Sequence, residues 1–216
     1  MAAAGPTGTH PIRRPGADTH EAAEARQRLI DAAVNCIIDT GYYRASSNRI
    51  AERAGVTWGV IQYHFGTRER LMLAVFEDAC ARLVEHWNAW QVTGDTVLEQ
   101  LSSYLQLLVS YYNRPEFLAY LEINLNLSRE SSTSEETMTS LRQIREEMEQ
   151  QPPKIPAVAP RHHTLIFESL RGLILSHLLR TTNVLTPAVD SEAAFQERAR
   201  ELVASLAAYV NAHPEP

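Results

Sequence analysis

The stretch that decides the fold is Ala54–Phe65, "AGVTWGVIQYHF". Gly55 can end a helix, because glycine readily adopts the left-handed conformation that follows many helix C-termini. Thr57 comes two residues later and has a hydroxyl suited to the N-cap of another helix. The stretch therefore predicts a tight turn followed by a short helix that is crowded with aromatic and amide side chains.

A second short helix precedes this turn. It begins near Ser46 or Ser47, whose hydroxyls also suit an N-cap, and it ends at Gly55. Ile50 and Ala51 are spaced so that they face inward. Two short helices joined in this way form a helix-turn-helix, a motif that places its second helix in the major groove of DNA.

The rest of the chain also shows helical spacing of its apolar residues, and no alternating run is bounded by hairpin turns. The stretch "LEINLNLS" from Leu121 alternates like a strand, but Leu118, Leu121 and Leu125 also fit a helix, which we favour because helices flank it. The proline-rich run "QPPKIPAVAP" at 151–160 predicts a loop. We expect an all-α protein of about nine helices, at roughly 21–40, 46–54, 57–65, 67–90, 95–112, 115–129, 134–150, 161–181 and 191–212.

Composition indicates a soluble globular protein. Of the 216 residues, 44% are hydrophobic and 21% are charged, and no apolar run approaches the ~20 residues that a membrane-spanning helix needs. The first residues lack the apolar segment of a secretory signal. We therefore expect a cytoplasmic protein without a membrane partner, with a flexible tail at 1–20, a helix-turn-helix DNA-binding domain at 21–66 and a C-terminal ligand-binding and dimerisation domain at 67–216.

The charge distribution favours DNA as a partner for the helix-turn-helix. The whole chain has a formal net charge of -6, but the segment 44–70 holds five arginines against two glutamates. The N-terminus of the second helix would offer free backbone N–H groups to a phosphate, and Gln62 could bond adenine bidentately. The expected DNA contacts are Ser46, Ser47, Asn48, Thr57, Trp58, Gly59, Gln62, Tyr63 and Arg68. The alternative is a helical hairpin within a bundle, with Trp58 and Tyr63 in the core.

Residues 41–75 resemble the DNA-binding signature of the tetracycline-repressor (TetR) family of bacterial transcription regulators. The residues that carry the resemblance are Gly41-Tyr42, Ile50-Ala51, Ala54-Gly55-Val56, Gly59, His64-Phe65, Glu69, Leu71 and Ala74-Val75. The resemblance implies a homodimer whose last two helices form a four-helix interface. It also implies a ligand pocket in each C-terminal half and repression that a small molecule relieves.

Two positions depart from the family pattern. Gln62 stands where the family usually has a tyrosine, and Arg68 stands where it usually has a lysine. Arg68 keeps a positive charge for a phosphate, whereas Gln62 replaces a common contact and can serve as a direct reader of a base. These departures leave the expected fold unchanged and concern the operator sequence.

The C-terminal half offers two sets of candidate residues. Polar and aromatic residues on apolar stripes are the candidates for a ligand pocket, although each also suits a structural role: Trp87, Trp90, Tyr104, Asn124, Arg171 and His177. Wide apolar stripes on the last two helices predict a subunit interface. Its candidate residues are Leu170, Ile174, Phe195, Leu202, Leu206 and Tyr209.

The sequence shows no motif of a known catalytic site, such as a nucleophile elbow, a P-loop or a zinc-binding helix. His162-His163 is the best metal candidate, but neighbouring residues on a helix point in different directions. We expect no catalytic residue, metal or cofactor. The expected partners are double-stranded operator DNA, an unknown small-molecule effector and a second copy of the chain. The alternatives are an all-helical interaction scaffold and a helical enzyme without a recognisable motif.

Overall fold

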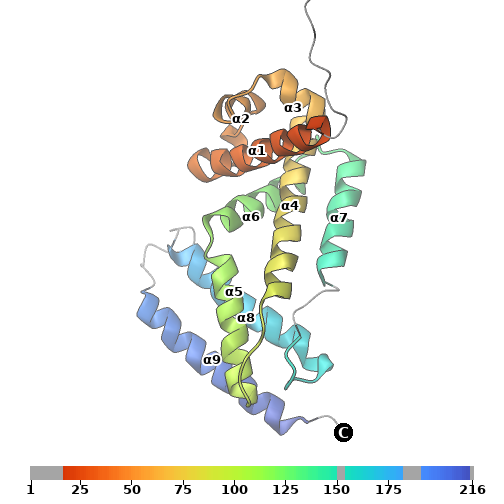
Figure 1. Cartoon of the computed structure of the whole chain (residues 1–216). Helices are drawn as coiled ribbons and strands as arrows, with labels where there is room; N and C mark the ends of the chain where they lie inside the picture. The colour runs from red at the N-terminus through yellow and green to blue at the C-terminus, as the bar shows by residue number, and fades with distance from the viewer. Residues whose placement is uncertain (1–16, 150–153, 182–190, 215–216) are drawn as a thin grey trace, which may run out of the picture.

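The structure is a computed structural model that describes residues 17–149, 154–181 and 191–214. Within these residues the chain forms nine α-helices and one short 3-10 helix, η1 (Figure 1). The prediction of an all-α protein is confirmed. The helices are α1 (Ala17–Thr40), η1 (Tyr42–Arg44), α2 (Ser47–Arg53), α3 (Trp58–Phe65), α4 (Arg68–Ala89), α5 (Val97–Tyr112), α6 (Pro115–Leu127), α7 (Glu135–Glu149), α8 (Pro160–Thr181) and α9 (Glu192–Ala212).

The ends of the short helices follow local sequence signals. Gly41 and Gly55 follow α1 and α2 with φ angles of 80° and 68°, which an L-residue with a side chain rarely adopts. Ser46 is the N-cap of α2, where its Oγ accepts a hydrogen bond from the backbone N–H of Arg49 at 3.4 Å. The turn between α2 and α3 is therefore encoded by residues that lie within it.

Two stretches test the helix boundaries further. The segment that alternates like a strand is helical and belongs to α6. This helix starts with Pro115, at a position where the missing N–H of proline costs nothing. Its buried residues Ala119, Tyr120 and Ile123 recur at helical spacing. The first helix begins at Ala17 rather than near Glu21, so the helix extends into the segment that we expected to be tail.

The apolar core is arranged around α4, which runs about 33 Å through the centre of the molecule (Figure 1). One part of the core lies where α1, α2, α3, α6 and α7 pack around the first half of α4. The other part lies where α5, α8 and α9 pack near its second half. Since Leu71 and Val75 belong to the first part and Leu83 and Trp87 to the second, α4 connects both ends of the molecule.

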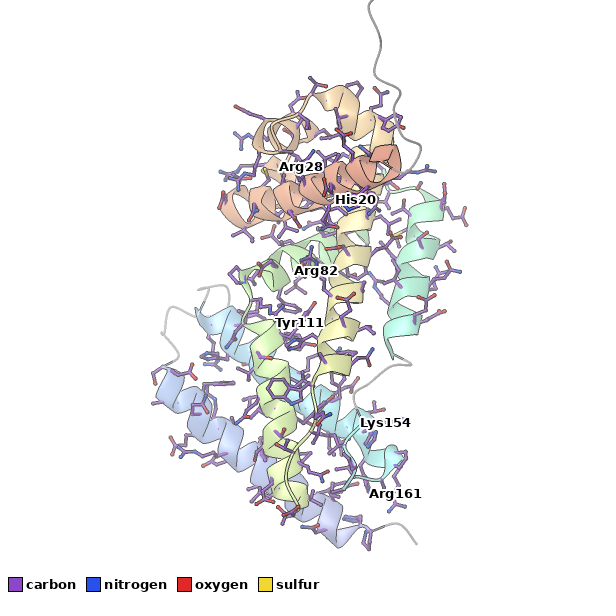
Figure 2. The ribbon with its side chains drawn as sticks, in the orientation of Figure 1. His20, Arg28, Arg82, Tyr111, Lys154 and Arg161 are labelled. Atoms are coloured by element: carbon purple, nitrogen blue, oxygen red, sulfur yellow. The ribbon has the colours of Figure 1, made fainter. Side chains whose placement is uncertain are left out.

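Polar contacts also join α4 to its neighbours. The Nη2 of Arg82 lies 3.2 Å from the Oδ1 of Asp31 on α1, and the hydroxyl of Tyr111 on α5 donates to the backbone oxygen of Ala79 at 3.4 Å (Figure 2). In the part of the chain that the structure describes, no helix is both long and apolar enough to cross a membrane.

Candidate nucleic-acid interface

α3 has one buried side and one exposed side. Ile61 and Phe65 are buried and fix the helix to the core. Trp58 is 49% exposed and Tyr63 is 81% exposed, and Gln62 is also exposed. The alternative in which Trp58 and Tyr63 pack in the core is therefore wrong, and these side chains are available to a partner.

The N-terminus of α3 is open to solvent. Thr57 takes the N-cap position with φ -86° and ψ 158°, but its side chain makes no capping hydrogen bond with any residue that the structure describes. Thr57, Trp58 and Gly59 are all exposed. The first N–H groups of a helix lack partners within the helix and carry a partial positive charge, so this end suits a phosphate oxygen.

Gly59 is a further sign of close approach from outside. A Cβ atom at this position would meet Thr57 Oγ1 at 3.7 Å, which is ordinary van der Waals contact, so packing within the protein does not require glycine here. Glycine in a helix costs up to about 1 kcal/mol relative to alanine. The absent side chain leaves room over the first turn of α3 for the edge of a base or a sugar-phosphate backbone.

The expected contacts on α2 lie at the same end of the molecule as α3, farthest from α9 (Figure 1). Ser46 and Asn48 are exposed, and Ser47 is half-buried. Their hydroxyl and amide groups can donate hydrogen bonds to phosphate oxygens. This placement agrees with a helix-turn-helix in which both helix N-termini are accessible.

Arg68 differs from the other expected DNA contacts, because it is half-buried and its guanidinium is hydrogen-bonded to the protein backbone. Its Nε donates to the backbone oxygen of Ala45 at 2.9 Å, and its Nη2 donates to that of Tyr42 at 2.6 Å. The guanidinium carbon also lies 4.4 Å from the centroid of the Tyr42 ring. From these contacts we infer that Arg68 positions the junction of η1 and α2 rather than contacting a phosphate.

Three exposed residues near α2 were not among the expected contacts: Tyr43, Arg44 and Arg49. Tyr43 is 73% exposed, and its ring packs edge-on against that of Tyr42 at 5.4 Å. The two arginines belong to the basic segment 44–70, and this local charge is the sequence feature that could have identified them as DNA contacts. Apolar periodicity does not reveal a 3-10 turn of three residues, so the exposure of Tyr43 could not be read from it.

The expected ligand residues divide into two groups in the structure. Four of them lie in or next to the part of the core formed by α4, α5 and α8: Trp87, Trp90, Tyr104 and Arg171. The Trp87 ring packs edge-on against Phe167 at 6.2 Å, and the Arg171 guanidinium lies 4.9 Å from the centroid of the same ring. Burial raises the pKa of the nearby Tyr112 to about 12, although the positive charge of Arg171 and a hydrogen bond from it act in the opposite direction.

Asn124 and His177 lie elsewhere. The Oδ1 of Asn124 accepts a hydrogen bond from Arg145 Nε at 3.1 Å, between α6 and α7. The His177 ring stacks on Phe195 of α9 at 4.3 Å, and its Nε2 lies 3.7 Å from a carboxylate oxygen of Glu192. The six candidate residues are therefore not gathered in one place, and the ligand pocket stays a prediction.

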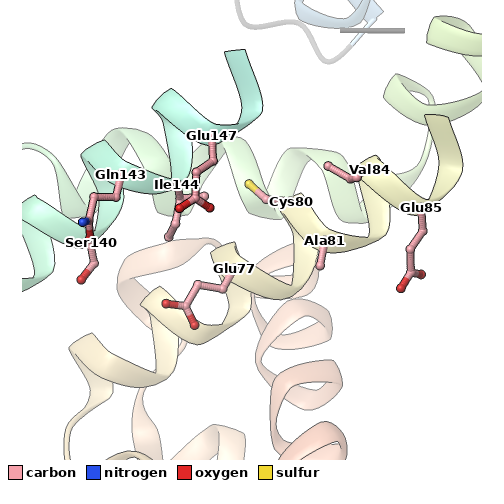
Figure 3. Close-up of a pocket in the computed structure, with 9 residues that line it drawn as sticks. All are labelled: Glu77, Cys80, Ala81, Val84, Glu85, Ser140, Gln143, Ile144 and Glu147. Carbon is pink, nitrogen blue, oxygen red and sulfur yellow. The ribbon is translucent and has the colours of Figure 1, made fainter. Parts of the chain in front are cut away.

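A groove of about 610 Å³ runs between α4 and α7 (Figure 3). Its lining combines apolar side chains with three carboxylates. None of the six expected ligand residues lines it. The lining residues are Glu77, Cys80, Ala81, Val84, Glu85, Ser140, Gln143, Ile144 and Glu147.

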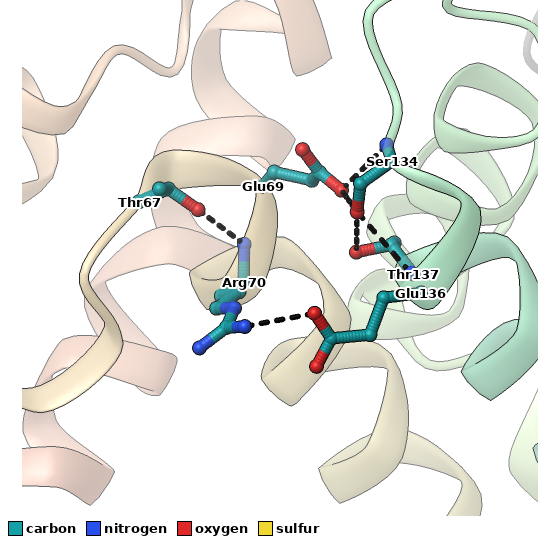
Figure 4. Close-up of polar contacts among 6 residues, drawn as sticks. All are labelled: Thr67, Glu69, Arg70, Ser134, Glu136 and Thr137. Atoms are coloured by element: carbon teal, nitrogen blue, oxygen red, sulfur yellow. Dashed lines mark hydrogen bonds and ion pairs between the residues drawn. The ribbon is translucent and has the colours of Figure 1, made fainter.

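The first turn of α4 is tied to the start of α7 by a polar cluster (Figure 4). Glu69 Oε1 accepts hydrogen bonds from the backbone N–H of Ser134 at 3.0 Å and from its hydroxyl at 2.6 Å. Arg70 lies 2.9 Å from a carboxylate oxygen of Glu136. Burial favours the protonated form of Glu69, but the hydrogen bonds from Ser134 and Thr137 outweigh it and lower the pKa of this carboxyl. The cluster therefore connects the start of α7 to the first turn of α4, which follows α3 closely in the chain.

The expected subunit-interface residues also divide by burial. Leu170, Ile174 and Phe195 are fully buried inside the protomer, and Leu206 is nearly so. These four side chains offer almost no surface to a second protomer, and the predicted interface itself stays a prediction. Leu202 is half-buried and Tyr209 is 40% exposed, and these two remain available.

Comparison with known proteins points to one family for the helix-turn-helix region. Residues 29–75 match the family model described as bacterial regulatory proteins, tetR family. The match covers α2 and α3 entirely, together with the end of α1 and the start of α4.

Curated relatives with similar sequences are regulators. The chain is 30% identical over 112 residues to the HTH-type transcriptional repressor AcnR of Corynebacterium efficiens, which covers 52% of this chain and 53% of that protein. It is 29% identical over 90 residues to the fatty acid metabolism regulator protein of Bacillus subtilis, covering 40% of this chain and 46% of that one. The chain thus spans about half the length of these relatives.

Solved structures extend the likeness of fold to the C-terminal half. The multidrug binding protein EbrR complexed with ethidium has a TM-score of 0.61 at 24% identity, covering 85% of this chain and 98% of that one. The regulator FadR from Bacillus subtilis in complex with stearoyl-CoA has a TM-score of 0.56 at 18% identity, covering 84% and 97%. At these identities the likeness concerns the fold alone. The named proteins are regulators or ligand-binding proteins, so the comparisons favour a regulator over the enzyme alternative.

Proposed function

Because residues 29–75 of this chain belong to the tetR family of bacterial regulatory proteins, we propose that the protein is a homodimeric repressor that binds operator DNA and releases it when a small molecule binds. In this proposal residues 21–66 form the DNA-binding domain, and residues 67–216 bind the effector and form the dimer. The protein acts in the cytoplasm, where bacterial DNA lies.

The observation that carries the proposal is the exposed side of α3. Trp58, Gln62 and Tyr63 are all exposed there, on a helix whose opposite side is fixed by Ile61 and Phe65. Exposed aromatic and amide side chains on one short helix give it groups that can stack and hydrogen-bond with a partner. On the second helix of a helix-turn-helix, these groups suit the major groove of DNA.

Within this surface we assign roles by chemistry. Gln62 reads a base, since its amide can both donate to and accept from adenine. Arg44 and Arg49 are exposed and contact phosphates, in the place that the sequence had given to Arg68. Ser46 and the open N-terminus of α3 add uncharged donors to the DNA backbone. Such contacts position the helix, while Gln62 supplies the sequence preference.

The dimer is supported by the exposed apolar residues of the last two helices. On α8, Leu165 is 46% exposed, and a Cβ at Gly172 would meet nothing within 4 Å. On α9, Leu202 is half-buried and Tyr209 is 40% exposed. Two-fold pairing of α8 and α9 would cover these residues. It would also give the dimer two α3 helices, each of which can contact one half of an inverted repeat.

Repression and effector release rest on the relatives. AcnR is named a transcriptional repressor, and the structures of EbrR and FadR hold ethidium and stearoyl-CoA. In this chain α4 extends from the junction next to α3 to the aromatic packing of Trp87, so one rigid element spans both regions. A ligand would lower DNA affinity only if it binds the DNA-free arrangement better.

The test is selection of DNA from a random duplex library by the purified protein. We expect enrichment of an inverted repeat whose half-sites are one helical turn apart, or a multiple of it, and a mobility shift that competitor DNA of random sequence does not remove. A helical scaffold or an enzyme would enrich no sequence. Recovery of no common motif, with equal binding to all duplexes, would refute the proposal.

A further inference from the structure

Two tryptophans bury hydrogen-bond donors that have no partner. The indole Nε1 atoms of Trp87 and Trp90 are shielded from solvent, and neither finds an acceptor among the residues that the structure describes. Trp87 as a whole is only 7% exposed. Leaving a buried donor unpaired costs about 1–3 kcal/mol, and native proteins rarely leave one so. Trp87 lies in the last turn of α4, and Trp90 is its C-cap residue, with its ring 6.3 Å from that of His86. Both donors therefore need an acceptor from outside the described residues, and a bound ligand is one source of it.

The surroundings of these donors are apolar but not neutral. Phe167 of α8 contacts both the Trp87 ring, at 6.2 Å, and the Arg171 guanidinium, at 4.9 Å. Trp87 and Arg171 are thus brought to the same ring from α4 and α8. Indole and guanidinium are both donors that cannot accept a hydrogen bond. The Arg171 side chain is only partly buried, and its ion pair with the exposed Glu168 is long, at 4.0 Å. Arg171 also donates a hydrogen bond to Tyr112, but a guanidinium has five N–H donors, so Arg171 retains donors for a ligand.

Two further aromatic side chains lie near Arg171, because its positive charge opposes the rise that burial gives to the pKa of Tyr104 and of Tyr112. Tyr104 is fully buried next to this group, and Tyr112 packs on Phe117 with ring centroids 4.5 Å apart. Aromatic side chains of this size favour an apolar body in their partner. A ligand that satisfies the whole cluster must combine an apolar body with a head that only accepts hydrogen bonds and carries a negative charge.

We propose that the cluster of Trp87, Trp90, Phe167 and Arg171 is the effector site and that it takes an apolar carboxylate. The carboxylate oxygens accept from the two indole N–H groups, with Arg171 near the charge, and the apolar body lies among the aromatic side chains. This rests on the proposed function, since it names the chemical class of the effector. The acid-lined groove between α4 and α7 would favour the opposite charge and is therefore not the site of this ligand.

The chain supplies its own control for the test. It contains three tryptophans, and the third, Trp58, is exposed on α3, in the proposed DNA-binding surface. In protein with 15N-labelled tryptophan, each indole N–H gives a separate resonance. Decanoate should move the resonances of Trp87 and Trp90 downfield, as expected for a new hydrogen bond to a carboxylate, and should leave that of Trp58 in place.

Three probes with the same ten-carbon alkyl group and different head groups test the class of ligand: decanoate, decanol and decylammonium. We expect decanoate to bind at least about tenfold more tightly than the other two, because a hydrogen bond to a charged group is worth about 1.5–3 kcal/mol. Trp87→Phe keeps a ring and removes the donor, so it should weaken decanoate by about tenfold or more and leave decanol unchanged. Arg171→Met should likewise weaken the binding of decanoate and leave that of decanol unchanged. Trp58→Phe should change the affinity for neither probe.

Several outcomes would overturn the inference. Equal binding of decanoate and decanol, or no decanoate binding at all, would exclude a carboxylate-specific site. A preference for decylammonium would point to the groove between α4 and α7 instead. If in each of these cases the protein still selects an inverted repeat from the DNA library, the effector class is wrong while the proposed function stands. Loss of DNA selection in the unmodified protein would remove the proposed function itself.

Discussion

The backbone N–H of Tyr42 donates a hydrogen bond to Glu122 Oε2 at 2.7 Å, although the two residues are 80 positions apart in the chain. Tyr42 begins η1 and Glu122 lies on α6. The Tyr42 hydroxyl also lies 3.4 Å from Glu130, and its backbone oxygen accepts from Arg68. Residues of the C-terminal half therefore hold the turn that leads into α2. The positions of α2 and α3 thus depend on contacts with both α4 and α6.

The first prediction concerns this contact. Glu122→Ala leaves the Tyr42 N–H without its acceptor in a half-buried site, so we expect a loss of about 1–3 kcal/mol in the free energy of unfolding. Glu122→Gln keeps an acceptor oxygen and should lose less. Urea denaturation followed by circular dichroism measures both values. Equal stability of Glu122→Ala and the unmodified protein would show that the contact contributes nothing.

The second prediction separates positioning from phosphate contact. Arg68→Ala should weaken binding to every DNA sequence without changing how steeply affinity falls with salt, because its guanidinium binds backbone oxygens of the protein. Arg49→Ala, the matched control, removes an exposed charge and should reduce the slope of log K against log salt by about 1. Fluorescence anisotropy at several salt concentrations gives both slopes. A reduced slope for Arg68→Ala would restore its phosphate contact.

The third prediction concerns sequence preference. Gln62→Ala removes the amide that we assign to base reading, so binding to the selected operator should weaken by about 1–3 kcal/mol, and preference should relax at one base position of each half-site. Competition among operators substituted at each position measures this change. If the variant loses the same free energy on every operator, Gln62 does not read a base.

The fourth prediction concerns the tie between α4 and α7. Ser134→Ala removes the hydroxyl that donates to Glu69, so the pKa of Glu69 should rise toward its ordinary value of 4.5. A carboxyl with a lowered pKa stabilises the fold above its unfolded-state pKa, and this stabilisation is lost as the pH falls through the folded-state pKa. The variant should therefore be less stable than the unmodified protein at pH 7, by about 0.5–1.5 kcal/mol. The difference should shrink as the pH falls below 4.5. Urea denaturation across this range measures it, and a pH-independent difference would contradict the role of the Glu69 charge.

The fifth prediction concerns the dimer. Leu202→Asp and Leu165→Asp would each place a charge in the proposed interface, so we expect monomers in size-exclusion chromatography with light scattering. Leu165 is the safer of the two, because nearly half of its side chain is exposed in the protomer. Leu125→Asp on α6 is a control of similar exposure outside α8 and α9 and should stay dimeric. Dimers in all three variants would place the interface elsewhere.

The sequence by itself determined the helices and the helix-turn-helix. Helix ends depend on residues near them, such as Gly55, whose positive φ ends α2, and Ser46, whose hydroxyl caps its first turn. Local propensity and the spacing of apolar residues act within a few positions, so both can be recognised without the fold. The same local pattern placed Gln62 on an exposed side of the reading helix.

The tertiary structure alone decided which partner each side chain meets. The sequence predicts a phosphate contact for Arg68, and only the fold shows that the carbonyl oxygens of Tyr42 and Ala45 accept hydrogen bonds from it. Phe195 and Leu202 both belong to one apolar stripe, yet the protomer buries the first and leaves the second half-covered. A repeating apolar pattern fixes which side of a helix is hydrophobic but not what covers it, because the covering residues come from segments distant in the chain. For the same reason only the fold shows that Trp87 and Trp90 bury donors without an acceptor in the described residues.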